Sequence, residues 1–135
     1  MKIIVRFLIV FMLVACGNNV QPTAKPAAQP TNQQQTVDGI SITLTEQIAP
    51  AINKQQAWIV ALQRDGKPID NADVYLDLDM PSMPMGQNKP LAVAQGNGSY
   101  KAEGTYTMGG LWHVTVHATI DGKDIAAKFD VNVPE

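Results

Sequence analysis

The sequence predicts an all-β domain, a sandwich of about seven strands, within residues 37–135. Apolar and polar residues alternate along several stretches, which is typical of strands with one buried face. Turn sequences with Gly, Asp or Asn recur about every ten residues, which is the spacing found in sandwiches and barrels. No stretch has a convincing helical apolar period, so a helical domain is not favoured.

Turn or breaker residues bound the predicted strands. Trp58 and Trp112 lie at inward positions of two different strands, so both are expected in the core. Turns at Gly109-Gly110 and Asp121-Gly122 flank the Trp112 strand, which fits Greek-key topology and an immunoglobulin-like sandwich. Asn97-Gly98 suits a tight hairpin turn. The predicted strands are residues 39–45, 56–64, 73–80, 91–94, 99–106, 111–120 and 124–133.

Residues 1–15 have the features of a lipoprotein signal peptide. Lys2 and Arg6 form the positive n-region, and the apolar stretch that continues to Val14 is too short to span a bilayer. The stretch ends in Leu-Val-Ala before Cys16, which resembles the bacterial lipobox. That resemblance implies cleavage before Cys16 and its modification with diacylglyceryl and palmitate, which anchor the protein extracytoplasmically on the cell membrane or outer membrane. The alternative is an ordinary secretory signal with an incidental cysteine.

Residues 16–36 contain Cys16 and a linker that is predicted to be flexible and disordered. The segment is rich in Gln, Asn, Pro, Ala and Thr, and it offers too little apolar area to offset the entropy of ordering. Cleavage removes Lys2 and Arg6, so the mature chain has eight basic and twelve acidic residues, a net charge of −4. Because nucleic-acid binding needs a basic surface, nucleic acid is not expected as a partner.

The mature sequence contains no recognisable catalytic motif. It has no thiol besides Cys16, no His-Glu-x-x-His motif, no phosphate-binding loop and no serine elbow with ordered partners. We therefore expect a domain that is not an enzyme.

Methionines gather where the predicted strand 73–80 ends. Pro81 and Pro84 cannot donate to a sheet ladder, so the chain bends there and carries Met80, Met83 and Met85 in or beside a loop. Met108 precedes a second turn, and in a sandwich the two loops can lie at one end. Thioethers are soft ligands that suit Cu(I). The sequence therefore predicts a Cu(I) site with Met83 and Met85 as primary ligands and Met80 and Met108 as helpers.

His113 lies five residues beyond Met108 and is a further candidate ligand. It is separated from His117 by about 13 Å along the strand, so the two histidines cannot bind one ion together. Surface exposure without a ligand is the default interpretation of both. Methionine also fills gaps in cores, so the loop alternatively closes the end of the sandwich or forms an apolar patch for a protein partner. Met80 continues the inward series of its strand, which favours a place in the core.

Four motifs within residues 56–133 resemble the YtkA-like domain, a small β-sandwich of bacterial exported and membrane proteins. They are Gly-x-Pro-φ-x-x-Ala-x-Val at residues 66–74, the methionine loop at 80–86, Gly-Ser-Tyr-Lys-Ala at 98–102 and Met-Gly-Gly-Leu-Trp-His-Val at 108–114. The YtkA-like domain is related to that of FixH-type proteins, which are associated with assembly of copper-containing respiratory oxidases. The resemblance implies a connection to copper, although a lipid anchor replaces the transmembrane helix of FixH-type proteins.

Two functional hypotheses follow from the sequence. The first is a lipid-anchored extracytoplasmic binding module that holds or transfers Cu(I) through the methionine loop. The second is a metal-independent interaction domain of the cell envelope, in which the loop docks a protein partner or caps the core. Substitution of the loop methionines by leucine, which has a similar shape, separates the two hypotheses.

Overall fold

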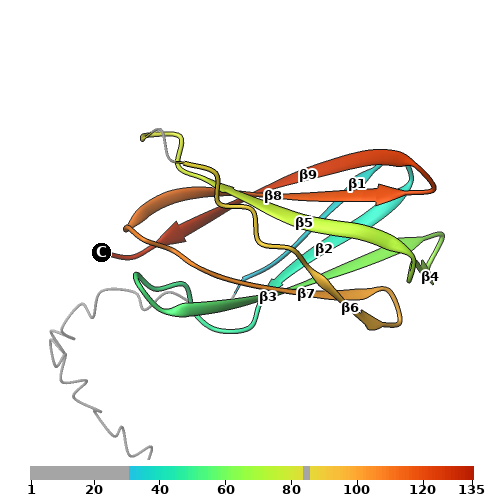
Figure 1. Cartoon of the computed structure of the whole chain (residues 1–135), viewed down its shortest axis with the longest axis horizontal. Coiled ribbons are helices and arrows are strands. Elements are labelled where there is room, and N and C mark those ends of the chain that lie inside the picture. The colour runs from blue at the N-terminus through green and yellow to red at the C-terminus, as the bar shows by residue number, and fades with distance from the viewer. Residues whose placement is uncertain (1–30, 84–85) are drawn as a thin grey trace, which may run out of the picture.

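The computed structural model describes residues 31–83 and 86–135, and this part of the chain folds into nine β-strands in two antiparallel sheets (Figure 1). The larger sheet has the order β1-β2-β3-β7-β6, with β4 paired to β3, and the smaller sheet has the order β5-β8-β9. The all-β prediction is therefore confirmed. The strands are β1 (Asn32–Val37), β2 (Ile40–Glu46), β3 (Gln55–Arg64), β4 (Lys67–Pro68), β5 (Ala72–Asp79), β6 (Val93–Gly96), β7 (Ser99–Thr105), β8 (Gly110–Ile120) and β9 (Lys123–Val133).

Seven of the strands have the connectivity of a constant-type immunoglobulin domain. The order β2-β3-β7-β6 matches strands A, B, E and D, and the order β5-β8-β9 matches strands C, F and G. The predicted immunoglobulin-like sandwich therefore describes these seven strands correctly. β1 and the two-residue β4 are additions that the sequence analysis did not predict.

β1 corrects the predicted boundary between linker and domain. The composition of residues 32–36 predicts linker, but these residues lie in β1 and pair with β2. Most of their side chains are exposed, and the Gln33 and Gln35 amides donate to backbone carbonyls of β9. The composition argument failed because backbone and amide hydrogen bonds can order a polar strand with little apolar burial. The signal peptide, Cys16 and the linker up to residue 30 lie outside the described residues.

The strand predicted at residues 91–94 is displaced to β6. Residues 88–92 instead follow the edge of β5, where the amides of Leu76 and Leu78 donate to the carbonyls of Pro90 (2.9 Å) and Asn88 (3.0 Å). The chain then crosses to the larger sheet, where β6 pairs with β7. The segment after the methionine loop therefore covers an edge of one sheet before it joins the other.

Inward side chains of both sheets form a single apolar core. Trp58 and Trp112 are fully buried, as predicted, and Tyr106 lies between them. The ring centroid of Tyr106 is 5.5 Å from that of Trp58 and 5.1 Å from that of Trp112. Aromatic pairs at such distances contribute about 0.5–1.5 kcal/mol beyond the area that they bury. The three rings therefore join the two sheets near one end of the sandwich.

The two ends of the sandwich have different structures, and we name them the turn end and the loop end. The turn end carries four two-residue hairpin turns, in which both residues have positive φ, as type I′ turns require. These turns are Asp38-Gly39, Asp65-Gly66, Asn97-Gly98 and Asp121-Gly122. The loop end carries Thr31, residues 47–54, the methionine loop, the 106–109 connection and the C-terminus (Figure 1).

Candidate functional site

Met80 is a core residue at the loop end. It follows the inward residues Val74, Leu76 and Leu78, and its side chain is only 5% exposed. Its carbonyl accepts a hydrogen bond from the amide of Met83 (3.1 Å), which tightens the chain directly after β5. Its methyl group lies against Gly110, where an added Cβ would approach within 3.2 Å. The parity of the strand therefore placed Met80 correctly in the core.

Met83 is exposed to solvent over 48% of the residue. It lies just beyond Pro81, and both residues follow the end of β5. Met85, the other predicted primary ligand, lies outside the described residues. The methionine loop therefore contains one methionine that is buried and one that is open to solvent.

Met108 lies at the same end of the sandwich as Met80, as the sequence analysis expected of the two loops. It is partly buried against the core, and its carbonyl accepts a hydrogen bond from the indole of Trp112 (3.0 Å). That bond fixes the backbone of the 106–109 connection just before β8 begins. Met108 is therefore held in a defined position at the loop end.

His113 lies on the outer face of the smaller sheet, opposite to the face that carries Met80. Its register partners are Asp79 on β5 and Asp130 on β9, and its Nε2 lies 3.4 Å from the Asp130 carboxylate. The His113 side chain is 22% exposed. It lines a hollow of about 360 Å³ together with Gly86 and Gln87, so the far part of the methionine loop reaches this face. The structure thus places His113 beside the loop but apart from Met80.

His117 occupies a separate place on the same outer face. Its ring stacks on Tyr75 with centroids 4.6 Å apart and an interplanar angle of 2°. The Lys89 Nζ atom lies over the Tyr75 ring, 5.9 Å from the ring centre. His117 is therefore occupied by an aromatic contact and serves as a matched control for His113.

The structure describes residues 31–83 and 86–135. Within these ranges, no three His, Cys, Asp or Glu side chains are grouped so that they could hold a metal ion. The same ranges contain no helix that is long and apolar enough to cross a membrane.

The sequence analysis missed a buried polar cluster at the loop end. Tyr106 donates its hydroxyl hydrogen to Glu46 (2.9 Å) and accepts a hydrogen bond from the indole of Trp58 (3.2 Å). Thr31 also donates to the Glu46 carboxylate (2.6 Å). Burial, followed by the nearby Glu46 charge, raises the pKa of Tyr106 well above its ordinary value. Glu46 falls at an inward position of the alternating strand Ile40–Glu46. This alternation is the sequence feature from which the burial of Glu46 could have been predicted.

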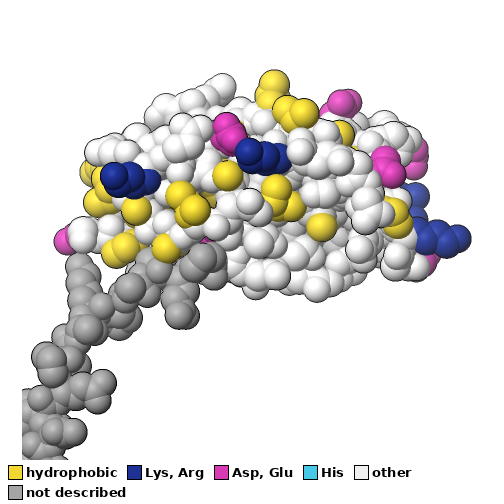
Figure 2. Space-filling model, turned by 90° about the horizontal axis from the view of Figure 1, so that it is seen from below, with side chains coloured by type: hydrophobic (Ala, Val, Ile, Leu, Met, Phe, Trp, Pro, Cys, Tyr) yellow, Lys and Arg dark blue, Asp and Glu magenta, His cyan; other side chains and the backbone are white. Residues whose placement is uncertain are grey.

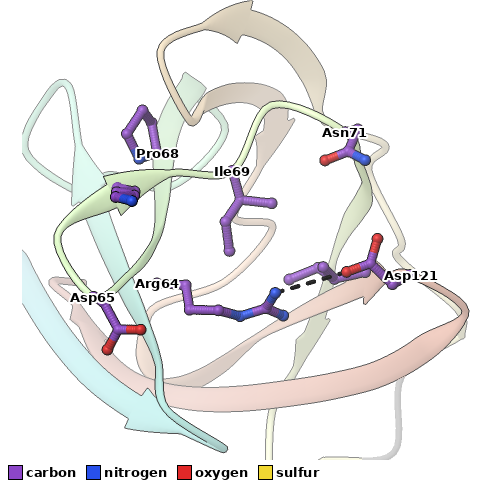
Figure 3. Close-up of a pocket in the computed structure, with 8 residues that line it drawn as sticks. Arg64, Asp65, Pro68, Ile69, Asn71 and Asp121 are labelled. Carbon is purple, nitrogen blue, oxygen red and sulfur yellow. Dashed lines mark ion pairs between the residues drawn. The ribbon is translucent and has the colours of Figure 1, made fainter.

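A hollow of about 420 Å³ lies at the turn end, away from the methionines (Figure 3). The Arg64 guanidinium extends toward Asp121, and the two groups form an exposed ion pair of 3.7 Å. Two basic and two acidic side chains line the hollow, so it does not favour a ligand of one charge. The lining residues are Arg64, Asp65, Lys67, Pro68, Ile69, Asn71, Ile120 and Asp121. We therefore place the candidate site at the loop end.

The fold and the loop end define the class of protein as an immunoglobulin-like sandwich that exposes a methionine at one end. The family model described as YtkA-like matches residues 33–117, and the chain belongs to this family. The match begins in β1, upstream of the motifs at residues 66–114, and it ends within β8. No curated protein matches the chain. The relation to FixH-type proteins stays a prediction.

Proposed function

We propose that this protein is a membrane-anchored, extracytoplasmic binding module that holds or transfers Cu(I) at the loop end. The observation that carries the proposal is the solvent exposure of Met83, 48% of the residue, in a proline-bounded loop of a β scaffold. A thioether remains a ligand for Cu(I) at any pH, because it carries no proton to lose. Met83 and Met85 are the primary ligands in this proposal.

The remaining candidates differ in how well the fold presents them. Met108 is partly buried at the loop end, so part of this residue remains accessible at the surface. His113 lies beside the far part of the loop but forms an ion pair with Asp130 when it is protonated. Met80 is buried in the core, and its use as a ligand would require that the core opens. We therefore keep Met108 and His113 as helpers and leave Met80 out.

The anchor is the second part of the proposal. Cys16 carries the lipid, and the protein lies on the extracytoplasmic face of the cell membrane or outer membrane. The supporting observation is the sequence before Cys16, with its basic n-region, short apolar stretch and lipobox-like end. The expected mature chain begins at a lipidated cysteine.

A metal-independent interaction domain is the second candidate function. Leu91 and Val93 are exposed large apolar residues; Leu91 precedes β6, an edge strand of the larger sheet, and Val93 is its first residue. Apolar side chains that gather on a surface commonly mark protein contacts. A partner protein of the cell envelope is therefore the alternative ligand of this domain.

Competition with a chromogenic Cu(I) chelator under reducing, anaerobic conditions tests the copper proposal. We expect that Met83→Leu combined with Met85→Leu weakens Cu(I) binding by about 100-fold or more, because two soft ligands are lost. Met108→Leu and His113→Gln are expected to have smaller effects. Wild-type affinity in the double variant would refute the copper proposal and favour the interaction domain.

Two matched variants control this measurement. Met80→Leu keeps the shape of a buried side chain and should leave Cu(I) affinity unchanged. His117→Gln removes a histidine of the same face that stacks on Tyr75, and it should also leave the affinity unchanged. An effect of either control as large as that of the double variant would show that the loss reflects the fold and not the ligands.

A further inference from the structure

Large apolar side chains are exposed at the loop end. Ile48 follows β2, Met83 follows β5 and Leu111 lies at the start of β8, and their exposed fractions are 45%, 48% and 44%. The three residues come from three separate segments that the fold brings to one end of the sandwich. We call these three exposed side chains of the loop end, Ile48, Met83 and Leu111, the apolar rim.

Charged side chains gather instead at the turn end. Lys123 pairs with Asp38 (3.0 Å), and Arg64 pairs with Asp121 (3.7 Å), around the hairpin turns. On the face shown in Figure 2, hydrophobic side chains are spread mainly over the left and middle, and basic and acidic side chains occur along the whole length, with several at the right. Lys54 and Glu135 are exposed at the loop end, so that end is not free of charge. The two ends nevertheless differ in character.

The chain enters the domain at the loop end. The amide of Glu46 donates to the carbonyl of Thr31 (2.9 Å), and the Thr31 hydroxyl donates to the buried Glu46 carboxylate. Thr31 is therefore fixed beside the segment that leads to Ile48. Residues 16–30 connect this point to the anchoring cysteine, and fifteen residues can span at most about 50 Å. The connection thus starts from the end of the domain that carries the apolar rim.

We propose that the apolar rim docks on the bilayer surface to which the protein is anchored. This inference rests on the lipid anchor of the proposed function, and because Met83 is also a proposed Cu(I) ligand, the docked state and the Cu(I)-bound state are alternatives at this side chain. The tether keeps the domain near the bilayer at a high effective concentration, so weak insertion of three side chains is enough. The mature chain has a net charge of −4, and the contact is therefore apolar and not an attraction to anionic lipid. The turn end, with its paired charges, faces away from the membrane.

Spin-label accessibility in the full, acylated chain tests the proposal. Acylation blocks Cys16, so one cysteine introduced by Leu111→Cys or Ile48→Cys is the sole reactive thiol for a nitroxide. The protein is placed in vesicles of phosphatidylethanolamine and phosphatidylglycerol. We expect collisions with a water-soluble nickel chelate to fall by about threefold or more relative to the unacylated Cys16→Ser form, and collisions with oxygen to rise.

Asp121→Cys provides the matched control at the turn end, where the residue is exposed. Its accessibility should stay unchanged on anchoring. Equal accessibility changes at Leu111 and Asp121, or none at either, would overturn the docking proposal, and so would a mass spectrum that shows no lipid on Cys16. Chelator competition on the same anchored protein reports copper binding separately. Loss of docking with intact copper binding, or the reverse, therefore distinguishes the two proposals.

Discussion

The turn end and the loop end of this sandwich are held together by different kinds of contact. At the turn end, backbone hydrogen bonds join neighbouring segments. The Leu62 amide donates to the Gly98 carbonyl (2.8 Å), and the Ile69 amide donates to the Leu62 carbonyl (3.0 Å). At the loop end, side chains far apart in the sequence meet: Glu46, Trp58 and Tyr106 share hydrogen bonds in the core. Both ends contain backbone hydrogen bonds, but a cluster of aromatic and polar side chains with the carboxylate of Glu46 occurs at the loop end.

This difference supports the proposal that the loop end is the binding end. Two-residue turns leave little chain to vary, because their dihedral angles are already determined by the twist of the strands. At the loop end, the buried rings and Met80 complete the core, so the exposed residues that follow Met80 contribute little to it. The methionine loop can therefore carry exposed side chains without a large cost in stability.

The largest effect is expected from Gly98→Ala at the turn end. A Cβ at Gly98 would lie 2.6 Å from the Leu62 carbonyl oxygen and 2.9 Å from Pro68 Cβ, and the residue has a φ of +71°. Both the clash and the strained dihedral disfavour alanine, so we expect a loss of about 3 kcal/mol or more in unfolding free energy. Urea denaturation measures this loss.

Gly66→Ala is the matched control for Gly98→Ala. Gly66 has a similar φ of +74°, but nothing lies within 4 Å of an added Cβ. The expected loss is therefore only that of the left-handed backbone, about 1 kcal/mol. Equal losses in the two variants would contradict the view that close backbone packing holds the turn end.

Removal of either of two buried tyrosine hydroxyls is expected to lower the unfolding free energy by less than Gly98→Ala does. Tyr106→Phe leaves the Glu46 Oε1 atom and the Trp58 indole without a partner, although Thr31 still donates to Glu46 Oε2, and we expect a loss of about 2–3 kcal/mol. Tyr100→Phe removes bonds to two backbone groups, the Ile69 carbonyl (2.7 Å) and the Ala72 amide (3.1 Å), and should cost about 1–2 kcal/mol. Equilibrium unfolding of both variants tests the order, and a larger loss in Tyr100→Phe would reverse the comparison.

The smallest expected effect is a decrease of stability at alkaline pH, which is caused by Tyr106 at the loop end. Because the pKa of Tyr106 is raised in the folded state, its stabilising effect is full below the unfolded pKa of about 10. Above pH 10 the unfolded state loses the proton first, so stability falls by about 1.4 kcal/mol per pH unit from this group. Denaturation curves between pH 8 and 11 should show that the difference in unfolding free energy between the wild type and Tyr106→Phe decreases as the pH rises. A constant difference over that range would refute the assignment.

Much of the fold could be predicted because its signals are local. Alternation located the strands of the immunoglobulin-like core, and Asn97-Gly98 and Asp121-Gly122 marked tight turns that the structure contains. The same parity placed Trp58, Trp112 and Met80 in the core. The polar composition of residues 32–36 misled the analysis, because β1 is held by hydrogen bonds to β2 and β9 and not by apolar burial.

The candidate site could be predicted only in part. The two methionine-bearing segments do lie at the same end, but Met80 faces the core while His113 lies on the outer face beside Asp130. Strand parity alone separates Met80 from His113 once the register Asp79↔His113 is known, and that register is not a local property. The partners of Glu46 were likewise hidden, because Tyr106 is sixty residues away in the sequence.

The amino-acid sequence by itself determined the strands, the tight turns and the identity of the inward residues. These features depend on neighbours within a few positions, where backbone sterics and side-chain alternation act directly. The tertiary structure decided which distant side chains meet: the Glu46-Tyr106-Trp58 cluster, the His113-Asp130 pair and the apolar rim near Thr31. These contacts depend on the packing of the two sheets and on the register of their strands, and both are determined by the core as a whole.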